Sequence, residues 1–63
     1  MIKYQIVKME PFKHPSDPNA TTLFFSDGKR AHLPSEWMAL NIPHINDWFV
    51  VNEGTVTIER AIP

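Results

Sequence analysis

The 63-residue sequence contains no cysteine, only two glycines and no long apolar run. Without cysteine the protein has no disulfide bonds, and its three scattered histidines lack the clustering of a structural zinc site. The apolar runs are too short to span a bilayer. Six basic and seven acidic side chains give a net charge of −1, so no strong field directs the chain to nucleic acid or to an acidic membrane surface.

The length of the chain limits how it can be stabilised. Residues 1–63 make one domain, and a domain of this size buries only about 60% of the surface that its unfolded form exposes. With neither disulfides nor a metal, stability has to come from packing of the aromatic side chains or from association with another chain. We therefore expect a homodimer or a tightly held partner. Because the chain begins with strand-like sequence and no apolar signal region, we also expect a short, stand-alone cytoplasmic gene product.

The stretch that organises the rest of the chain, residues 47–62, predicts a β-hairpin around the turn Glu53-Gly54. In the register of a two-residue loop, the apolar face of this hairpin carries Phe49, Val51, Val56, Ile58 and Ile62, with Asp47 opposite Arg60 at its open end. The other face is polar except for Trp48 and Val50. Glutamate suits the first position of a type I′ turn poorly, because this position needs a positive φ, so a three- or four-residue loop is the alternative.

A second hairpin is predicted around Asp27-Gly28, a strong signal for a two-residue turn. In the register that this turn implies, one face carries Thr22, Phe24, Ala31 and Leu33, and the other carries Leu23, Phe25, Arg30 and His32. We therefore expect Phe24 in the core, together with Tyr4, Ile6 and the apolar face of the C-terminal hairpin. Phe25 and Arg30 are expected on the outer face, where the guanidinium can lie over the ring.

The first twenty residues predict one more strand and a long loop. Residues 2–9 alternate between apolar and polar side chains until the phase changes near Ile6-Val7, which predicts either a β-bulge there or a strand covered on both faces at its end. Residues 10–20 contain three prolines and therefore predict a loop. This loop is either an ordinary crossover or a binding loop that carries Phe12, Lys13 and His14.

Residues 34–41 predict a helix of about two turns. Ser35 is the expected N-cap, and the helix is expected to dock on the sheet through Trp37 or Leu40, with Met38 beside them. The order of elements then predicts a mainly β fold, a small five-stranded antiparallel sheet or barrel with this one short helix between strands three and four. The position of the helix resembles the order in oligonucleotide/oligosaccharide-binding (OB) folds, whereas the length is closer to an SH3-like barrel.

The sequence offers little support for catalysis, cofactor binding or metal binding. It contains no Gly-x-Ser-x-Gly segment and no glycine-rich phosphate loop. Ser35 with His32 or His44 as its base is a candidate for nucleophilic catalysis, but a serine before a short helix is far more often a cap. His44 and Asp47 stand three residues apart without further ligands, too few for a zinc site. We therefore expect a protein that is not an enzyme, with no cofactor and no metal site.

A protein-binding function fits the aromatic residues best. Trp, Tyr, Met and Arg are enriched in protein interfaces, and the expected partner-binding residues are Trp48, Phe25, Arg30, Trp37 and Phe12. Trp48 is the expected anchor because it lies on the polar face of its hairpin; alternatively, the helix or the proline-rich loop covers it within the same chain. The second hypothesis is a nucleic-acid-binding protein, in which Phe25, Trp48 and Arg30 supply aromatic platforms and a basic group. Acidic residues interleaved among the basic ones favour a protein partner.

Three segments carry a resemblance to known proteins. They are the Met-Ile-Lys-Tyr start at residues 1–4, the Phe-Phe-Ser-Asp-Gly turn at residues 24–28 and the Asp-Trp-Phe-Val-Val-Asn-Glu-Gly turn at residues 47–54. In these segments and in its length, the chain resembles the short, stand-alone accessory proteins encoded by bacteriophages. The resemblance implies a protein without chemistry of its own that binds a host protein, in the cytoplasm of the host cell, and inhibits or redirects it.

Overall fold

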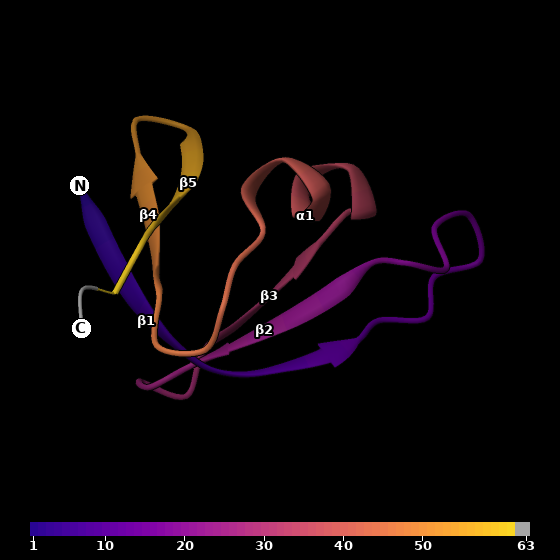
Figure 1. Ribbon diagram of the computed structural model, residues 1–63, viewed down its shortest axis with the longest axis horizontal. Helices are drawn as coiled ribbons and strands as arrows, with labels where there is room; N and C mark the ends of the chain where they lie inside the picture. Colours follow the sequence, from indigo (N-terminus) through magenta and orange to yellow (C-terminus); the bar gives the residue numbers. More distant parts are fainter. Residues whose placement is uncertain (62–63) are drawn as a thin grey trace.

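Five antiparallel strands form a sheet that curls into a half-barrel, and one short helix connects β3 to β4 (Figure 1). The structure, a computed structural model, describes residues 1–61. The elements are β1 (Ile2–Pro11), β2 (Thr21–Phe25), β3 (Arg30–Leu33), α1 (Ser35–Asn41), β4 (Trp48–Asn52) and β5 (Thr55–Glu59). The predicted mainly β fold with a helix between the third and fourth strands is confirmed. The strand order is β3-β2-β1-β4-β5, and within residues 1–61 the two edge strands, β3 and β5, do not pair with each other.

The central strand β1 serves both halves of the sheet. Its residues 2–5 pair with β4, and its residues 6–11 pair with β2. The register shifts between Ile6 and Lys8, so Val7 is the extra residue of a β-bulge, as the change of phase in the sequence predicts. Figure 1 shows β1 running beside β4 and then turning to run along β2.

The strand continues further than the sequence predicts, because Pro11 is its last residue and pairs with Thr21. Proline is tolerated at this place in a central strand for a local reason. The N–H of Phe12 donates to the carbonyl of Ala20, so the nitrogen of Pro11 faces the opposite side, where β4 no longer pairs with β1. The loop predicted over residues 10–20 is therefore shortened to residues 12–20.

The C-terminal hairpin has the predicted register. Phe49 lies opposite Ile58 and Val51 opposite Val56, across a two-residue loop. Glu53 and Gly54 adopt φ values of 49° and 81°, as a type I′ turn requires, so the glutamate accepts the left-handed conformation that it disfavours. The expected place of Ile62 on the apolar face lies outside the described residues.

The register predicted for the hairpin of β2 and β3 is wrong by one residue. The loop has three residues, because the N–H of Phe25 donates to the carbonyl of Lys29 at 2.9 Å and the N–H of Gly28 donates to the carbonyl of Phe25 at 3.0 Å. Gly28 takes a φ of 90°, which completes a turn followed by a glycine bulge. Since side chains alternate along a strand, this slip exchanges the two faces of β2 while β3 keeps its predicted orientation.

The core on the inner face of the sheet therefore contains Phe25 in place of Phe24. The buried cluster consists of Ile6, Leu23, Phe25, Leu33 and Phe49, and the predicted core residues Tyr4, Val51, Val56 and Ile58 pack against it half-buried. The ring centroid of Phe25 lies 5.1 Å from that of Phe49 and 5.2 Å from that of Tyr4. Phe24 lies half-buried on the opposite, outer face.

The short helix α1 docks through Trp37, whose ring centroid lies 5.8 Å from that of Phe49. Leu40, the alternative docking residue, is 81% exposed. The expected cap is also different, because Pro34 occupies the N-cap position and Ser35 is the first helical residue. The helix ends at Asn41, and the C-cap residue Ile42 takes a left-handed φ of 43°. No helix within residues 1–61 is long and apolar enough to cross a membrane.

The predicted pair of Asp47 and Arg60 forms at the open end of the C-terminal hairpin. The carboxylate of Asp47, a residue only 4% exposed, accepts the Arg60 guanidinium at 3.0 Å. It also accepts the backbone N–H groups of His44 and Ala61, each at 2.9 Å. One buried carboxylate thus ties the segment after α1 and the end of β5 to the start of β4.

Candidate partner-binding surface

The structure does not bring Trp48, Phe25 and Arg30 together. Phe25 is 6% exposed in the core, because of the slip of β2. Arg30 is exposed on the edge strand β3, where it lies opposite Phe24. Trp48 lies on β4, and β1 and β2 separate this strand from β3, which carries Arg30. Three strand spacings separate these positions by roughly 14 Å, so the predicted aromatic and basic patch does not form.

Trp48 lies half-buried on the outer face of β4, between Gln5 and Glu59 on the neighbouring strands. The ammonium group of Lys3 on β1 forms a 2.7 Å salt bridge with Glu59 on β5, and this ion pair crosses the outer face of β4. Val50, on the same face of β4, is 6% exposed. Strand side chains therefore cover part of this face, and the role of Trp48 as an anchor stays a prediction.

Trp37 makes contacts within its own chain. Its indole N–H donates to the carbonyl of Val56 at 3.2 Å. In the register of this hairpin, the Val51–Val56 pair is not hydrogen-bonded across the strands, so the carbonyl of Val56 points away from β4 toward the free edge of β5. Trp37 thus anchors α1 and covers part of that edge.

Phe12, the remaining predicted residue, stacks on a histidine of β3. The rings of Phe12 and His32 lie 4.1 Å apart at an angle of 19°. The His32 ring is held from the strand side, because its Nδ1 is hydrogen-bonded at 2.7 Å to the hydroxyl of Thr22. Thr22 is only 5% exposed, so the histidine is fixed on a buried support. By stacking on Phe12, His32 fixes the position of the Phe12 ring.

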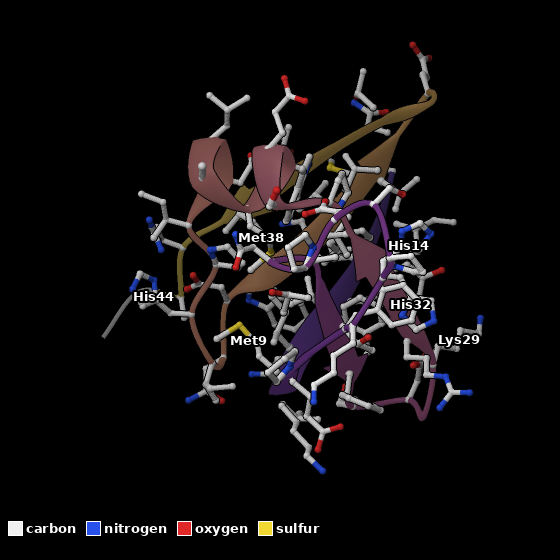
Figure 2. The ribbon with its side chains drawn as sticks, turned by 90° about the vertical axis from the view of Figure 1, so that its right-hand side faces the viewer. Met9, His14, Lys29, His32, Met38 and His44 are labelled. Carbon is white, nitrogen blue, oxygen red and sulfur yellow. The ribbon has the colours of Figure 1, made fainter. Side chains whose placement is uncertain are left out.

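A pocket of about 230 Å³ lies beside this stack, between the 12–20 loop and the end of β3. We call it the Phe12 pocket; it is lined mainly by Phe12, His14, Asp17, Ala20, His32 and Leu33. Figure 2 shows His14 and His32 next to each other on one flank of the molecule, opposite His44. Its lining is largely apolar and includes two histidines and one aspartate. This combination suits an apolar side chain that carries or neighbours a polar group.

Asp17 fixes the loop that forms the other wall. Its carboxylate accepts the backbone N–H of Ser35 at 2.9 Å, and so satisfies the first turn of α1 in the way that Ser35 is expected to do from the sequence. Hydrogen bonds from the backbone and side chain of Ser35 are the main cause that lowers the pKa of Asp17 below its ordinary value of 3.8. Within the loop, the carbonyl of His14 accepts the N–H of Asp17 at 3.1 Å.

The substitution Asp17→Ala is expected to loosen the Phe12 pocket. Hydrogen exchange at the Ser35 amide should accelerate, since this N–H loses its acceptor, and the melting temperature should fall. Because the pKa of Asp17 is lowered in the folded state, the contact is fully present above pH 3.8 and is lost as the pH falls through the lowered pKa. Ser16→Ala, in the same exposed turn, is the matched control; equal exchange at Ser35 in both variants would contradict this role for Asp17.

The Nδ1 atoms of all three histidines are hydrogen-bonded to side chains other than that of Ser35, the serine proposed from the sequence as a candidate nucleophile. His44 Nδ1 is bonded to Arg60 and His32 Nδ1 to Thr22, so neither of these nitrogens is paired with Ser35. In the exposed turn of the loop, Ser16 Oγ lies 2.9 Å from His14 Nδ1, two residues away. Over the described part of the chain, no three His, Asp or Glu side chains lie close enough together to hold a metal ion.

The residues that complete the pocket are hard to find from sequence. His32 and Leu33 alternate on a short strand, and Asp17 reaches a helix that begins 18 residues later. A Ser-Asp-Pro-Asn turn signals a loop but gives no indication of its distant partner. Comparison of the chain with protein families, with curated proteins and with solved structures finds no match.

Proposed function

We propose that this protein is a non-enzymatic binding protein that engages another protein through the Phe12 pocket and thereby modulates or inhibits it. The observation that carries the proposal is the stack of Phe12 on His32 beside a largely apolar pocket of about 230 Å³. Preformed apolar pockets with a few fixed polar groups are typical binding sites, and aromatic side chains dominate binding energies in protein interfaces. The resemblance to bacteriophage accessory proteins makes a host protein the expected partner.

A protein partner is preferred because, within residues 1–61, four of the six basic side chains, Lys3, Lys8, Lys29 and Arg60, are paired with carboxylates. Lys8 forms a 2.9 Å salt bridge with Glu10, and Lys29 lies 4.0 Å from Asp27. Exposed pairs of this kind contribute little to stability, but they reduce the net positive field that a phosphate backbone needs. The Phe12 pocket itself carries the carboxylate of Asp17, which would repel a phosphate.

A single-stranded nucleic acid is the second candidate ligand, because of Phe24. Its ring is half-buried on the outer face of β2, with the Lys8 ammonium 5.4 Å from the ring centroid and Arg30 directly opposite on β3. An aromatic ring flanked by basic side chains can stack a base while the cations contact phosphates. The slip of β2 thus gives Phe24 the position that the sequence assigns to Phe25.

Phe12→Ala is expected to weaken partner binding strongly while leaving the fold intact. Tagged wild-type protein should retain a specific protein from a bacterial lysate, and loss of a hot-spot aromatic worth about 2 kcal/mol should weaken that binding by about 30-fold. Trp48→Ala is the matched control, since it removes a half-buried aromatic from the other half of the sheet.

These two variants, together with one at Phe24, separate the alternative interfaces and ligands. Loss of binding in Trp48→Ala but not in Phe12→Ala would move the interface to the outer face of β4. Retention on single-stranded DNA that falls steeply with salt and requires Phe24 would favour the nucleic-acid function. Circular dichroism of each variant checks that the fold is intact.

A further inference from the structure

The free edge of β3 presents unused backbone hydrogen-bonding groups. The register of the β2–β3 pair makes Ala31 and Leu33 the residues that bond to β2, because Phe25 bonds to Lys29 and hydrogen-bonded pairs alternate along an antiparallel ladder. The N–H and C=O groups of Arg30 and His32 therefore point away from the sheet. From residue 1 to residue 61, no hydrogen bond reaches any of these four groups.

The opposite edge of the sheet is partly covered. On β5, the outward carbonyl of Val56 accepts the indole N–H of Trp37, and the ring of Trp37 packs against Phe49. Figure 2 shows Lys29 and His32 on one flank of the molecule, with Met38 of α1 nearer its middle. The two edges thus differ: on β5 Trp37 occupies one outward carbonyl and covers part of the edge, whereas on β3 all four outward groups are open to an added strand.

We propose that two copies of the chain associate through their β3 edges, as an antiparallel pair with Ala31 on the two-fold axis. In this register, Arg30 of each copy lies opposite His32 of the other. The outward N–H and C=O groups of both residues then form four intermolecular hydrogen bonds, which satisfy the edge of each copy completely. The small side chain of Ala31 leaves room at the axis. This inference concerns self-association and does not depend on the proposed partner at the Phe12 pocket.

The buried area and the charge at the interface determine how strongly the two copies are expected to associate. A stable dimer buries about 800 Å² per subunit, which is almost a fifth of the 4532 Å² that this chain exposes. A four-residue strand covers less than that, so the association is weak and reversible. The two Arg30 side chains lie near each other on the same outer face of the joined sheet, so their repulsion opposes pairing. Added salt should therefore strengthen the dimer, whereas it weakens binding to acidic ligands.

Two substitutions at one position test the pairing. Arg30→Pro removes the outward N–H without affecting the β2–β3 ladder, and proline is accepted on edge strands for this reason. Arg30→Ala keeps the N–H and removes the charge. Sedimentation equilibrium from about 10 µM to about 1 mM protein should show a monomer–dimer equilibrium for the wild type, association at least about tenfold weaker for Arg30→Pro, and equal or tighter association for Arg30→Ala.

Amide exchange of the wild-type protein supplies a second measurement that needs no variant. The amides of Arg30 and His32 should become protected as protein concentration rises, while the outward amide of Ile58 on β5 should not. A wild-type monomer at every concentration would overturn the proposal. So would dimerisation of Arg30→Pro with wild-type affinity, or concentration-dependent protection confined to β5 or to the exposed residues after α1.

Discussion

Phe49→Ala is expected to lower the free energy of unfolding by about 3–5 kcal/mol, which is enough to unfold most of the molecules of a domain this small. Phe49 is 6% exposed, and its ring centroid lies 5.1 Å from that of Phe25, 5.8 Å from Trp37 and 6.5 Å from Tyr4. The ring therefore joins β1, β2, β4 and α1. Its removal leaves a cavity at the place where all four elements meet. Urea denaturation followed by tryptophan fluorescence measures the effect.

Two neighbouring phenylalanines provide a matched comparison. Phe25→Ala should cost nearly as much as Phe49→Ala, whereas Phe24→Ala should cost about 1 kcal/mol, because its ring lies half-buried on the outer face. A larger loss of stability in Phe24→Ala than in Phe25→Ala would instead indicate the two-residue loop, in which the two faces of β2 are exchanged. An unchanged denaturation midpoint in Phe49→Ala would contradict the described core.

Asp47→Ala is expected to destabilise the protein by about 3 kcal/mol at neutral pH, because hydrogen bonds to a charged group contribute about 1.5–3 kcal/mol each. The buried carboxylate accepts two backbone N–H groups and one guanidinium, and the variant leaves these donors without their acceptor. Asp27→Ala is a suitable control, since the Asp27 side chain is exposed in a hairpin turn and accepts only one backbone N–H, that of Lys29.

The same carboxylate predicts a dependence of stability on pH. The N–H of Ala61, together with the N–H of His44 and the Arg60 guanidinium, holds the pKa of Asp47 below its ordinary value of 3.8, although burial alone would raise it. With the folded-state pKa lowered, the stabilisation is complete above pH 3.8 and disappears as the pH falls through the lowered pKa. The stability difference between wild type and Asp47→Asn should therefore shrink below pH 3.8. A constant difference down to pH 2 would contradict this assignment.

The parts of the fold that are predictable from sequence are those specified by nearby residues. The C-terminal hairpin keeps its register because a two-residue loop and the apolar side chains of its two strands agree. The bulge in β1 follows from the change of phase at Ile6-Val7. In the β2–β3 hairpin, Asp27-Gly28 suits both a two-residue and a three-residue loop, and adjacent phenylalanines give the same apolar pattern in either register. The choice between the two loop lengths depends on the contacts of this hairpin with β1, where the backbone carbonyl of Gln5 accepts the N–H of Ser26.

The candidate site is less predictable for the same reason. Phe12 is recognisable as an aromatic in a proline-rich loop. Its proposed role in binding depends on the stack with His32, which lies 20 residues further along the chain. Phe25 and Trp37, which suggest interface residues by their type, are used in the core and at the edge of β5. A small sheet has few apolar residues to spare, so the distinction between core and interface is made by tertiary packing.

The sharing of β1 between the two halves also bears on how the chain folds as it is synthesised. Residues 2–5 of β1 pair with residues 48–51, so this part of β1 leaves the ribosome well before the strand with which it pairs. Meanwhile β2 and β3 can close locally and pair with residues 6–11, leaving the apolar side chains of Tyr4 and Ile6 without the cover of β4. This partly assembled sheet is the state most exposed to aggregation or to capture by a chaperone, and it lasts until the β4–β5 hairpin has been synthesised.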